Sequence, residues 1–292
     1  MKETKGIILA GGNGSRLFPL TLGTSKQLIP VYDKPMIYYP LATLISGGIR
    51  DVLIITRKKD LKNYESLLGN GKSIGINISY AIQSKPNGIA ESIIIGSDFI
   101  SDNNVCLILG DNIFYGENFG FYFNKAKENL VHGYSSIFGV KVKNPQDFGV
   151  INFDSNQNIL SIIEKPNNPK SNFIVSGLYF FTNEVKQVAK NLKPSNRNEL
   201  EITDVNNHFL KKNKLKLINL DTKISWIDTG TYKSLSDATN FFHQIEKNSN
   251  KKVACIEEVA FKKGFINQQN LRKIAKKMEN SDYGKYLLKI VS

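Results

Sequence analysis

The chain has few of the side chains that build metal centres and covalent cross-links. Its 292 residues include two cysteines, three histidines, three methionines and one tryptophan. Two cysteines cannot form a disulfide framework, and the cysteines and histidines are too widely scattered to form a zinc site. Because Cys106 lies within an apolar run, we expect Cys106 and Cys255 to be buried, reduced thiols of a cytoplasmic protein.

Long apolar segments are also missing. No run reaches the roughly 18 residues that a membrane-spanning helix needs. An apolar strand begins by Gly6, which leaves no room for a signal peptide. We therefore expect a cytoplasmic protein with no membrane partner.

Positive charge, by contrast, is abundant. Lysine and arginine number 39 against 26 aspartates and glutamates, for a net charge of +13, which is compatible with nucleic-acid binding. The lysines are spread over the whole chain, however, and the densest stretch, residues 262–277, has the spacing of solvent-exposed helix faces. We expect anionic small substrates and no nucleic-acid partner.

The most informative segment is the glycine-rich stretch at residues 7–17. It begins as an apolar run with β-branched residues, typical of a buried strand, and breaks into a loop. Glycines let backbone N–H groups approach phosphate oxygens, and Arg16 and Lys26 add positive charge. A Rossmann G-x-G-x-x-G is excluded because Leu17 stands where the third glycine is needed. A P-loop is excluded because residues 71–73 lack the preceding glycine and strand. The segment predicts a loop that binds nucleotide phosphates.

The first half of the chain alternates between strands and helices. Strand patterns cover residues 5–10, 52–55, 76–81, 105–109 and 135–140, and helical patterns cover residues 36–46, 61–68, 89–99 and 119–130. This alternation predicts an α/β fold with a Rossmann-like, mostly parallel central sheet and helices on both faces. Ligands bind such sheets at the carboxyl ends of the strands, where the glycine-rich loop and Asp111 both fall.

The second half has a different rhythm. Strands at residues 149–153, 159–164 and 173–181 are separated only by turns, which predicts a mixed or antiparallel portion of the sheet. We expect helices at residues 184–191 and 199–211, a strand at 215–220, a loop at 226–231 and a helix at 232–247. A polar break at residues 247–252 precedes two or three short helices and no strand.

Residues 11–17 resemble the signature G-G-x-G-[ST]-R-L of the sugar-nucleotide pyrophosphorylases, a family of nucleotidylyltransferases. Five further segments are similar to those of members that use dTTP and glucose 1-phosphate: residues 25–41, 110–116, 164–166, 199–206 and 226–231. They follow in family order through nearly the whole chain. The resemblance implies that a phosphate oxygen of glucose 1-phosphate attacks the α-phosphorus of dTTP, giving dTDP-glucose and pyrophosphate. Because that nucleophile is already ionised, catalysis needs positioning and charge neutralisation rather than a general base.

Two carboxylates are candidate metal ligands. Asp111 directly follows the strand at 105–109 and is either a helix cap or a metal ligand, and Asp228 lies in the segment 226–231. Mg²⁺ typically takes one or two carboxylates together with substrate phosphates. The resemblance implies that Asp111 and Asp228 hold a Mg²⁺ cofactor.

The resemblance also implies roles for individual residues. Arg16 would bind the leaving pyrophosphate, Lys26 the α-phosphate and Lys165 the sugar phosphate, and these are the implied catalytic residues. The implied nucleotide-binding residues are Leu9, Gly11, Gly12, Gly14, Ser15, Arg16, Lys26, Gln27, Gln83, Pro86, Gly88 and Asp111. The implied sugar-phosphate-binding residues are Phe148, Gly149, Glu164, Lys165, Val175, Glu199 and Trp226. Apart from the resemblance, Lys165 and Glu164 have the pattern of a surface ion pair at a hairpin end.

Residues 83–88 follow the strand at 76–81 and form a candidate base-binding loop. A glutamine amide such as that of Gln83 can pair with both O4 and N3–H of thymine or uracil. Three residues depart from the usual pattern of the dTTP-using members: Phe148 replaces tyrosine, Asn87 replaces aspartate and Ser15 replaces threonine. None of these three positions belongs to the candidate catalytic and metal-binding charges, which are Arg16, Lys26, Asp111, Lys165 and Asp228.

The resemblance implies a division of the chain and an assembly. Residues 1–250 form the nucleotidyltransferase domain, with a nucleotide-binding part (1–130) and a sugar-binding part (131–250). Residues 251–292 form a helical segment that serves as an oligomer interface and a regulatory region. The implied assembly is a homotetramer inhibited by a dTDP-sugar end product.

Two other functions remain open at this point. The first is a uridylyl- or cytidylyltransferase. Thymine and uracil differ by one methyl group, and a pocket discriminates such a group by only about 1–3 kcal/mol. A non-catalytic sugar-nucleotide sensor is disfavoured because the charged residues named above are all present.

Overall fold

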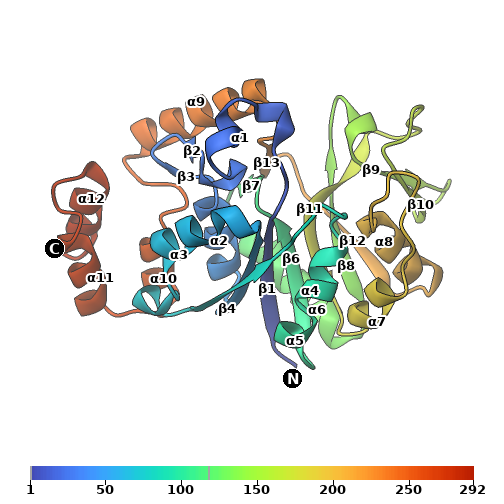
Figure 1. The fold of residues 1–292 in the computed structure, drawn as a ribbon, viewed down its shortest axis with the longest axis horizontal. Helices are drawn as coiled ribbons and strands as arrows, with labels where there is room; N and C mark the ends of the chain where they lie inside the picture. Colours follow the sequence, from blue (N-terminus) through green and yellow to red (C-terminus); the bar gives the residue numbers. More distant parts are fainter. Residues whose placement is uncertain (1, 118) are drawn as a thin grey trace.

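The computed structural model describes residues 2–117 and 119–292. In this part of the chain a nine-stranded sheet has the order β10–β9–β11–β6–β1–β4–β5, and β8 and β12 continue it beside β11 (Figure 1). Its strands are β1 (Thr4–Ala10), β4 (Asp51–Thr56), β5 (Asn77–Ile82), β6 (Asn104–Leu109), β8 (Ser135–Lys141), β9 (Gly149–Phe153), β10 (Ile159–Glu164), β11 (Phe173–Phe181) and β12 (Leu215–Asn219). The four strands β1, β4, β5 and β6 are parallel, whereas β11 is antiparallel to β6, β8 and β9. The predicted α/β fold with a large, mostly parallel central sheet is confirmed.

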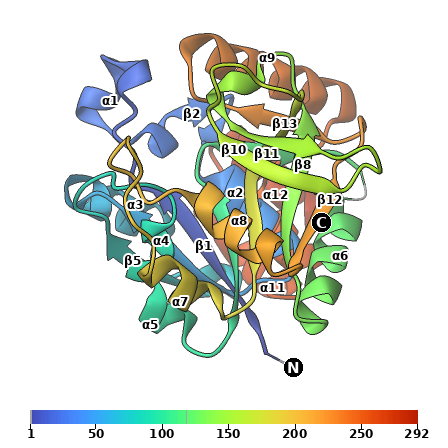
Figure 2. The same ribbon diagram turned by 90° about the vertical axis from the view of Figure 1, so that its right-hand side faces the viewer.

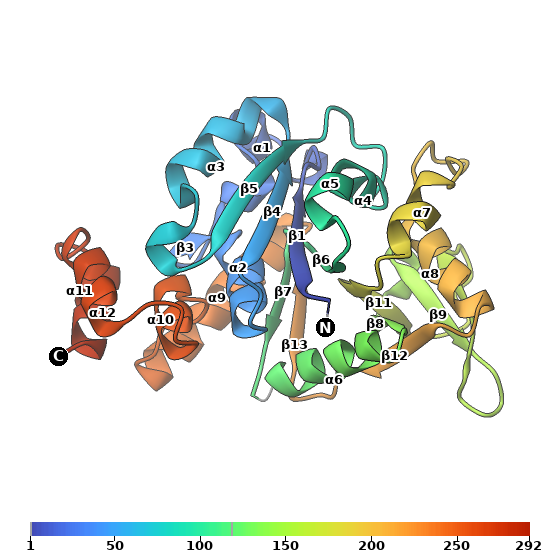
Figure 3. The same ribbon diagram turned by 90° about the horizontal axis from the view of Figure 1, so that it is seen from below.

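Helices cover both faces of this sheet because successive side chains of a strand point to opposite sides. On β1, Ile8 packs with α2 (Tyr38–Ser46) and α6 (Phe119–Val131), and Ile7 packs in the other layer. That other layer contains α4 (Glu91–Ile95), α5 (Ser97–Ile100), α7 (Val185–Lys190) and α8 (Ile202–Lys211). Figure 3 shows α4 and α5 on the opposite side of the central strands from α6. Helix α3 (Leu61–Leu68) also belongs to the first half of the chain.

A third, smaller core lies at the carboxyl ends of the strands. The long helix α9 (Tyr232–Ser249) packs there through Leu235, Ala238 and Phe242, and it crosses the top of the view in Figure 2. Beneath it lie the hairpin of β2 (Pro30–Val31) and β3 (Lys34–Pro35) and the pair formed by β7 (Asn112–Tyr115) and β13 (Ser225–Asp228). Short helices connect these elements: η1 (Ser15–Leu17), α1 (Leu20–Gly23), η2 (Lys26–Leu28), η3 (Lys58–Asp60), η4 (Lys72–Ile74) and η5 (Pro145–Asp147).

Three expectations about individual elements were wrong. Residues 226–231 were expected to form a loop, but β13 covers residues 225–228 because they pair antiparallel with β7. The single helix expected at 89–99 is divided into α4 and α5 at Gly96, whose Cβ position lies 2.8 Å from the Ile7 side chain. The helix expected from residue 199 begins only at Ile202, because the Leu200 backbone bonds to Asn87 and Ala90 instead.

The C-terminal segment consists of α10 (Ile256–Lys262), α11 (Gln268–Lys276) and α12 (Asp282–Ile290), with no strand among the residues described. They form one end of the molecule in Figure 1. The polar break before them is not a free linker. Lys252 forms ion pairs with Asp33 and with Glu246 (3.2 Å), and the Val253 N–H donates to Glu246 Oε1 (2.8 Å). Both cysteines are free and buried, as expected. Among residues 2–117 and 119–292, no helix has the length and apolar character needed to span a bilayer.

Candidate active site

The glycine-rich loop follows β1 at the carboxyl end of the parallel strands. Gly14 has φ of 62°, in the left-handed region that favours glycine. Its carbonyl oxygen accepts hydrogen bonds from Thr21 Oγ1 (2.8 Å) and from the Leu17 amide (2.9 Å). In the described part of the chain, nothing beyond its own neighbours lies within 4 Å of the Cβ position of Gly12. The loop is therefore anchored at Gly14 and open at Gly12, as close approach of a phosphate requires.

Lys26 and Asp111 form an ion pair beside this loop. Lys26 Nζ lies 2.5 Å from Asp111 Oδ2, and the lysine is only 5% exposed. The helix η2 that carries Lys26 is fixed by Ser25, whose hydroxyl donates to Gln27 Oε1 (2.9 Å) and bonds to the Tyr64 hydroxyl (2.8 Å). Burial by itself would raise the pKa of Asp111, but the charge and hydrogen bond of Lys26, together with the hydrogen bonds from Asn112 and the backbone, hold the pKa below its usual value.

Asp228, the last residue of β13, lies near Asp111 and Lys26. It pairs in register with Asn112, and the next residue, Thr229, donates from its N–H (3.1 Å) and its hydroxyl (2.8 Å) to the carbonyl oxygen of Asp111. Burial, followed by the nearby Asp111 carboxylate, raises the pKa of Asp228 to about 6. Arg16 lies beside it, since the Cβ position of Gly230 is 3.0 Å from both the Arg16 guanidinium and Asp228 Oδ2. Three distant segments thus bring two cations and two carboxylates together.

This donor set fits a hard divalent cation that is shared with a ligand. Among the residues described, no group of three or more histidine, cysteine, aspartate or glutamate side chains is placed to hold a metal ion. Asp111 and Asp228 are nevertheless close enough for the charge of one to raise the pKa of the other. Mg²⁺ is commonly bound by one or two carboxylates with phosphate oxygens and water as the other ligands. The pair fits that pattern.

Asn112 links Asp111 to the part of the chain that is expected to bind the sugar. Its Nδ2 donates to Asp111 Oδ1 (3.0 Å), and its Oδ1 accepts from the indole N–H of Trp226 (2.7 Å). The same indole N–H lies 2.8 Å from the carbonyl oxygen of Ser176. Gly177 makes room for Asn112, because its Cβ position is 2.8 Å from Asn112 Oδ1. Asn112 therefore orients Asp111, and the indole N–H of Trp226 in turn orients Asn112.

Glu164, one of the residues expected to bind the sugar, is the centre of a second polar cluster. Its Oε2 accepts from the Thr203 hydroxyl (2.5 Å), and its Oε1 lies 3.5 Å from the Arg197 guanidinium. Arg197 also bonds to both carboxylate oxygens of Glu199 (3.0 Å each) and lies 3.4 Å from Glu201. Thr203 and Arg197 were not identified from the sequence. The pattern of three glutamates, at 164, 199 and 201, was the available signal for an arginine partner.

The remaining residues expected on the sugar side lie on β9 and β11 or directly beside β9 and β10. Gly149 pairs in register with Glu164, and its Cβ position is 3.2 Å from the Thr203 hydroxyl. Lys165 has φ of 42°, and its N–H donates to the carbonyl oxygen of Phe148 (3.0 Å). The Phe148 ring packs edge-on against Trp226 with centroids 5.3 Å apart. Val175 is buried at an irregularity of β11.

Gln83 lies across the glycine-rich loop. The Cβ position of Gly11 is 2.4 Å from Gln83 Oε1. The amide nitrogen Nε2 donates to Glu91 Oε2 (2.7 Å) and to the carbonyl oxygen of Gly88 (3.3 Å). We expected this amide to offer both a donor and an acceptor to a base, which stays a prediction; in this structure both of its N–H groups have internal partners. Gly88 has φ of 107° and packs against the Leu200 backbone.

Four other expected nucleotide-binding residues lie around this region. Leu9 is on β1 next to Gly110, whose N–H donates to the Leu9 carbonyl oxygen (2.9 Å). Ser15 is in η1 and Gln27 is in η2. Pro86 is exposed in the loop that follows β5.

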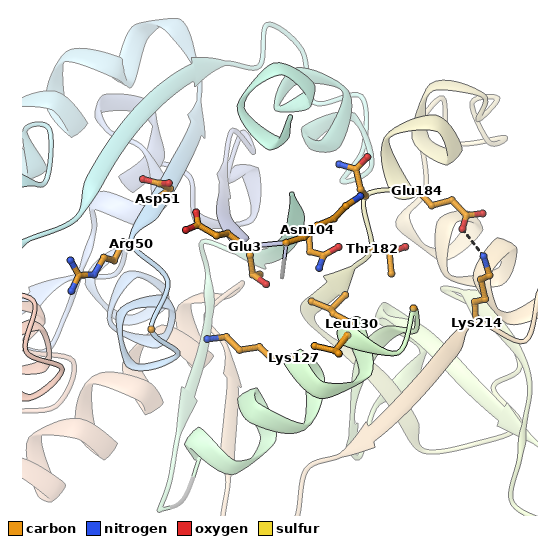
Figure 4. A pocket seen from close by; sticks show the side chains of 15 residues that line it. Glu3, Arg50, Asp51, Asn104, Lys127, Leu130, Thr182, Glu184 and Lys214 are labelled. Atoms are coloured by element: carbon orange, nitrogen blue, oxygen red, sulfur yellow. Dashed lines mark hydrogen bonds and ion pairs between the residues drawn. The ribbon is translucent and has the colours of Figure 1, made fainter. Parts of the chain in front are cut away.

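Two cavities lie at opposite ends of the sheet. One, of about 830 Å³, borders the charged cluster and is lined by Arg16, Phe148, Trp226 and Asp228 among others. The other, of about 700 Å³, lies at the amino ends of β1 and β6 and is shown in Figure 4. Its walls carry charges of both signs, and Glu184 is already paired with Lys214 (3.0 Å). Of these two cavities, the first is the one whose lining includes members of the charged cluster, Arg16 and Asp228.

Comparison with known proteins agrees with this geometry. The profile of the nucleotidyl transferase family matches residues 5–245. The chain belongs to this nucleotidyl transferase family. Two curated relatives are glucose-1-phosphate thymidylyltransferases. That of Neisseria meningitidis is 48% identical over 98% of this chain and 99% of its own. That of Mycobacterium tuberculosis is 46% identical over the same shares of the two chains.

Two solved structures agree as well. A crystal structure of a glucose-1-phosphate thymidylyltransferase from Bacillus anthracis, in complex with sucrose, matches with a TM-score of 0.76 and 39% identity, covering 82% of this chain and 95% of that one. A UDP-glucose pyrophosphorylase with UDP-glucose matches with a TM-score of 0.73 over 84% of this chain and all of that one, at 23% identity. The second likeness concerns the fold alone. This nucleotidyltransferase thus has its two cations and two carboxylates at the carboxyl ends of the strands, where the family fold binds ligands.

Proposed function

We propose that the chain transfers a thymidylyl group from dTTP to α-D-glucose 1-phosphate, giving dTDP-glucose and pyrophosphate. The observation that supports this most directly is the meeting of Arg16, Lys26, Asp111 and Asp228 beside an open glycine loop. Two polyanionic substrates need cations and a metal-binding carboxylate pair at one point. The curated relatives that cover nearly the whole chain carry this activity in their names.

The proposed roles follow from position and charge. Arg16 binds the leaving pyrophosphate through its fork of donors, and Lys26 neutralises charge at the α-phosphate. Lys165 holds the sugar phosphate, and Glu164 accepts hydrogen bonds from sugar hydroxyls. Asp111 and Asp228 would hold Mg²⁺, which when bound neutralises and aligns the phosphates. No general base is needed, since the attacking phosphate oxygen is already ionised.

The test is pyrophosphate release from glucose 1-phosphate, Mg²⁺ and one of dTTP, UTP or CTP at a time. We expect release with dTTP in the wild type. In Asp111→Asn and in Arg16→Ala we expect turnover to fall by at least 100-fold, with a raised Mg²⁺ requirement only in the first. A wild type that releases no pyrophosphate with any of the three nucleotides would contradict the proposal. A wild type that prefers UTP or CTP would redirect it to the corresponding transferase.

We further propose a homotetramer in which residues 251–292 contribute a subunit interface and a dTDP-sugar end product inhibits. In this proposal residues 1–130 bind the nucleotide and residues 131–250 bind the sugar phosphate. The likeness of residues 253–258 to the family supports the assignment. The test is a chain that ends at Asn250, studied by native mass spectrometry and inhibition assays. A shortened protein that remains tetrameric and fully inhibited would contradict it. Because Ile256 and Ala260 pack in the same core cluster as α2, we expect a lowered melting temperature as well.

A further inference from the structure

The side chain of Gln83 is held in one orientation by neighbours on both sides. Gln83 is 3% exposed, and its backbone N–H donates to the carbonyl oxygen of Thr56 (2.9 Å). Its side-chain nitrogen lies between two acceptors, the carboxylate of Glu91 (2.7 Å) and the carbonyl oxygen of Gly88 (3.3 Å). Backbone and side chain are therefore both fixed before any ligand arrives.

The identity of these partners decides which way the amide faces. A carboxylate and a carbonyl oxygen can only accept hydrogen bonds. If the amide were turned over, its oxygen would face the Glu91 carboxylate, and one charge-assisted hydrogen bond would be replaced by repulsion. The nitrogen therefore stays on the Glu91 side. The oxygen Oε1 is left on the other side, over Gly11 and the opening of the phosphate loop.

Glu91 is itself held by a second amide. Asn87 Nδ2 donates to Glu91 Oε1 (2.8 Å), so both oxygens of the carboxylate have a donor. Asn87 is one of the positions where the chain differs from the usual aspartate. An aspartate there has no N–H to donate and would place a second negative charge beside Glu91. In this chain, Asn87, Glu91 and Gln83 form a continuous series of hydrogen bonds that ends at one free acceptor.

We propose that Glu91 is a specificity-determining positioning residue, which makes Gln83 an obligatory hydrogen-bond acceptor toward the base. This rests on the proposed function and on the prediction from the sequence that the loop at residues 83–88 binds the base. An acceptor pairs with the N3–H of thymine or uracil. The ring of cytosine presents an unprotonated N3, so acceptor would face acceptor. A Gln83 oxygen held in this orientation disfavours cytosine nucleotides and does not distinguish thymine from uracil.

The magnitude expected from such a contact is large. A site that presents a hydrogen-bonding group to a base rejects the analogue that cannot pair, because a buried polar group is then left without a partner. In contrast, the methyl group that distinguishes thymine from uracil does not meet the Gln83 oxygen. The dTTP-to-dCTP ratio of kcat/KM should depend on Glu91, and the dTTP-to-dUTP ratio should not.

The experiment measures kcat/KM for dTTP, dUTP and dCTP with glucose 1-phosphate and Mg²⁺. These nucleotides share one sugar and one triphosphate, so they differ in the base alone. In Glu91→Leu, which removes the acceptor, we expect the dTTP-to-dCTP ratio to fall at least tenfold and the dTTP-to-dUTP ratio to stay within twofold of the wild type. Glu91→Gln is the matched control, because its amide oxygen still accepts from Gln83, and it should keep most of the preference. An equal loss for all three nucleotides in Glu91→Leu would show a structural role only and would overturn the proposal.

A second variant covers the case in which Glu91→Leu does not fold. Asn87 is exposed, so Asn87→Ala should fold normally, and loosening Glu91 should lower the dTTP-to-dCTP ratio several-fold. An unchanged ratio in Asn87→Ala would then overturn the proposal. A wild type without pyrophosphate release from dTTP would instead defeat the proposed function. An active wild type that uses dCTP as well as dTTP would defeat the inference about Glu91 alone.

Discussion

The ammonium of Lys26 and the carboxylate of Asp111 lie 2.5 Å apart in a largely buried position, although 85 residues separate them in the chain. Each is brought there by a different structural element, Lys26 by η2 and Asp111 by the turn between β6 and β7. A buried charge without a partner costs several kcal/mol. The two residues therefore depend on each other for stability as well as for the proposed chemistry.

Lys26→Met should destabilise the ligand-free protein, because it leaves Asp111 buried without its cation. We expect the free energy of unfolding to fall by about 3–5 kcal/mol. Adding Asp111→Asn to this variant should recover part of the loss, since the unpaired charge is then gone. Urea unfolding of the two single variants and the double variant measures this coupling. As a control, Lys233→Met breaks the exposed pair with Asp237 and should change the free energy by less than about 1 kcal/mol. Additive effects at Lys26 and Asp111 would contradict the expected coupling.

Asp228→Asn should stabilise the ligand-free protein at neutral pH and not at acidic pH. Because the pKa of Asp228 is raised from 3.8 to about 6, the folded state binds this proton more tightly than the unfolded state does. The stability that protonation of Asp228 contributes to the folded state is fully present below pH 3.8 and is lost as the pH rises through about 6. At pH 7.5 the charged side chain therefore opposes folding, and asparagine removes that cost. Melting curves at pH 4 and pH 7.5 in EDTA check the prediction, with Asp237→Asn as an exposed control. A variant that melts lower than the wild type at pH 7.5 would argue against it.

Gly11→Ala and Gly12→Ala should differ sharply although the residues are neighbours. A Cβ on Gly11 would lie 2.4 Å from Gln83 Oε1. A Cβ on Gly12 would have no atom of the described residues within 4 Å, apart from its two chain neighbours. We expect Gly11→Ala to lower the melting temperature and to raise the KM for dTTP, because Gln83 must move. Gly12→Ala should leave the melting temperature of the ligand-free protein within about one degree. Equal melting temperatures for the two variants would show that Gln83 is not held against the loop.

Trp226→Phe should lower the free energy of unfolding, because it removes the indole N–H donor. The substitution keeps an aromatic ring but leaves Asn112 Oδ1 and the Ser176 carbonyl oxygen without their donor. A buried polar group without a partner costs about 1–3 kcal/mol. We also expect kcat to fall more than KM rises, because Asn112 orients Asp111. Steady-state kinetics and urea unfolding measure both effects. A variant with normal stability would show that water replaces the indole N–H.

The local pattern of the sequence was enough to predict the parallel half of the fold. The strands β1, β4 and β6 are short apolar runs that alternate with helical patterns, and these signals require no knowledge of distant residues. The glycine-rich loop was predicted for the same reason, since glycine at residue 14 marks a conformation that few other residues adopt. Tail helices were also predicted from local periodicity.

Tertiary structure alone decided the features that depend on pairing between distant segments. Strand β13 reads as a loop in the sequence, and it becomes a strand because β7 offers it a partner more than a hundred residues earlier. The roles of Asn112, Thr203 and Arg197 were not visible either, because a polar side chain shows its type in the sequence but not its neighbour. Glu91 is the clearest case. Its charge was apparent from the start, but only the folded loop places that charge on the nitrogen of Gln83 and leaves the oxygen facing the site. The sequence by itself determined which groups are available, and packing decided which atoms face a ligand, since hydrogen-bond direction depends on both partners.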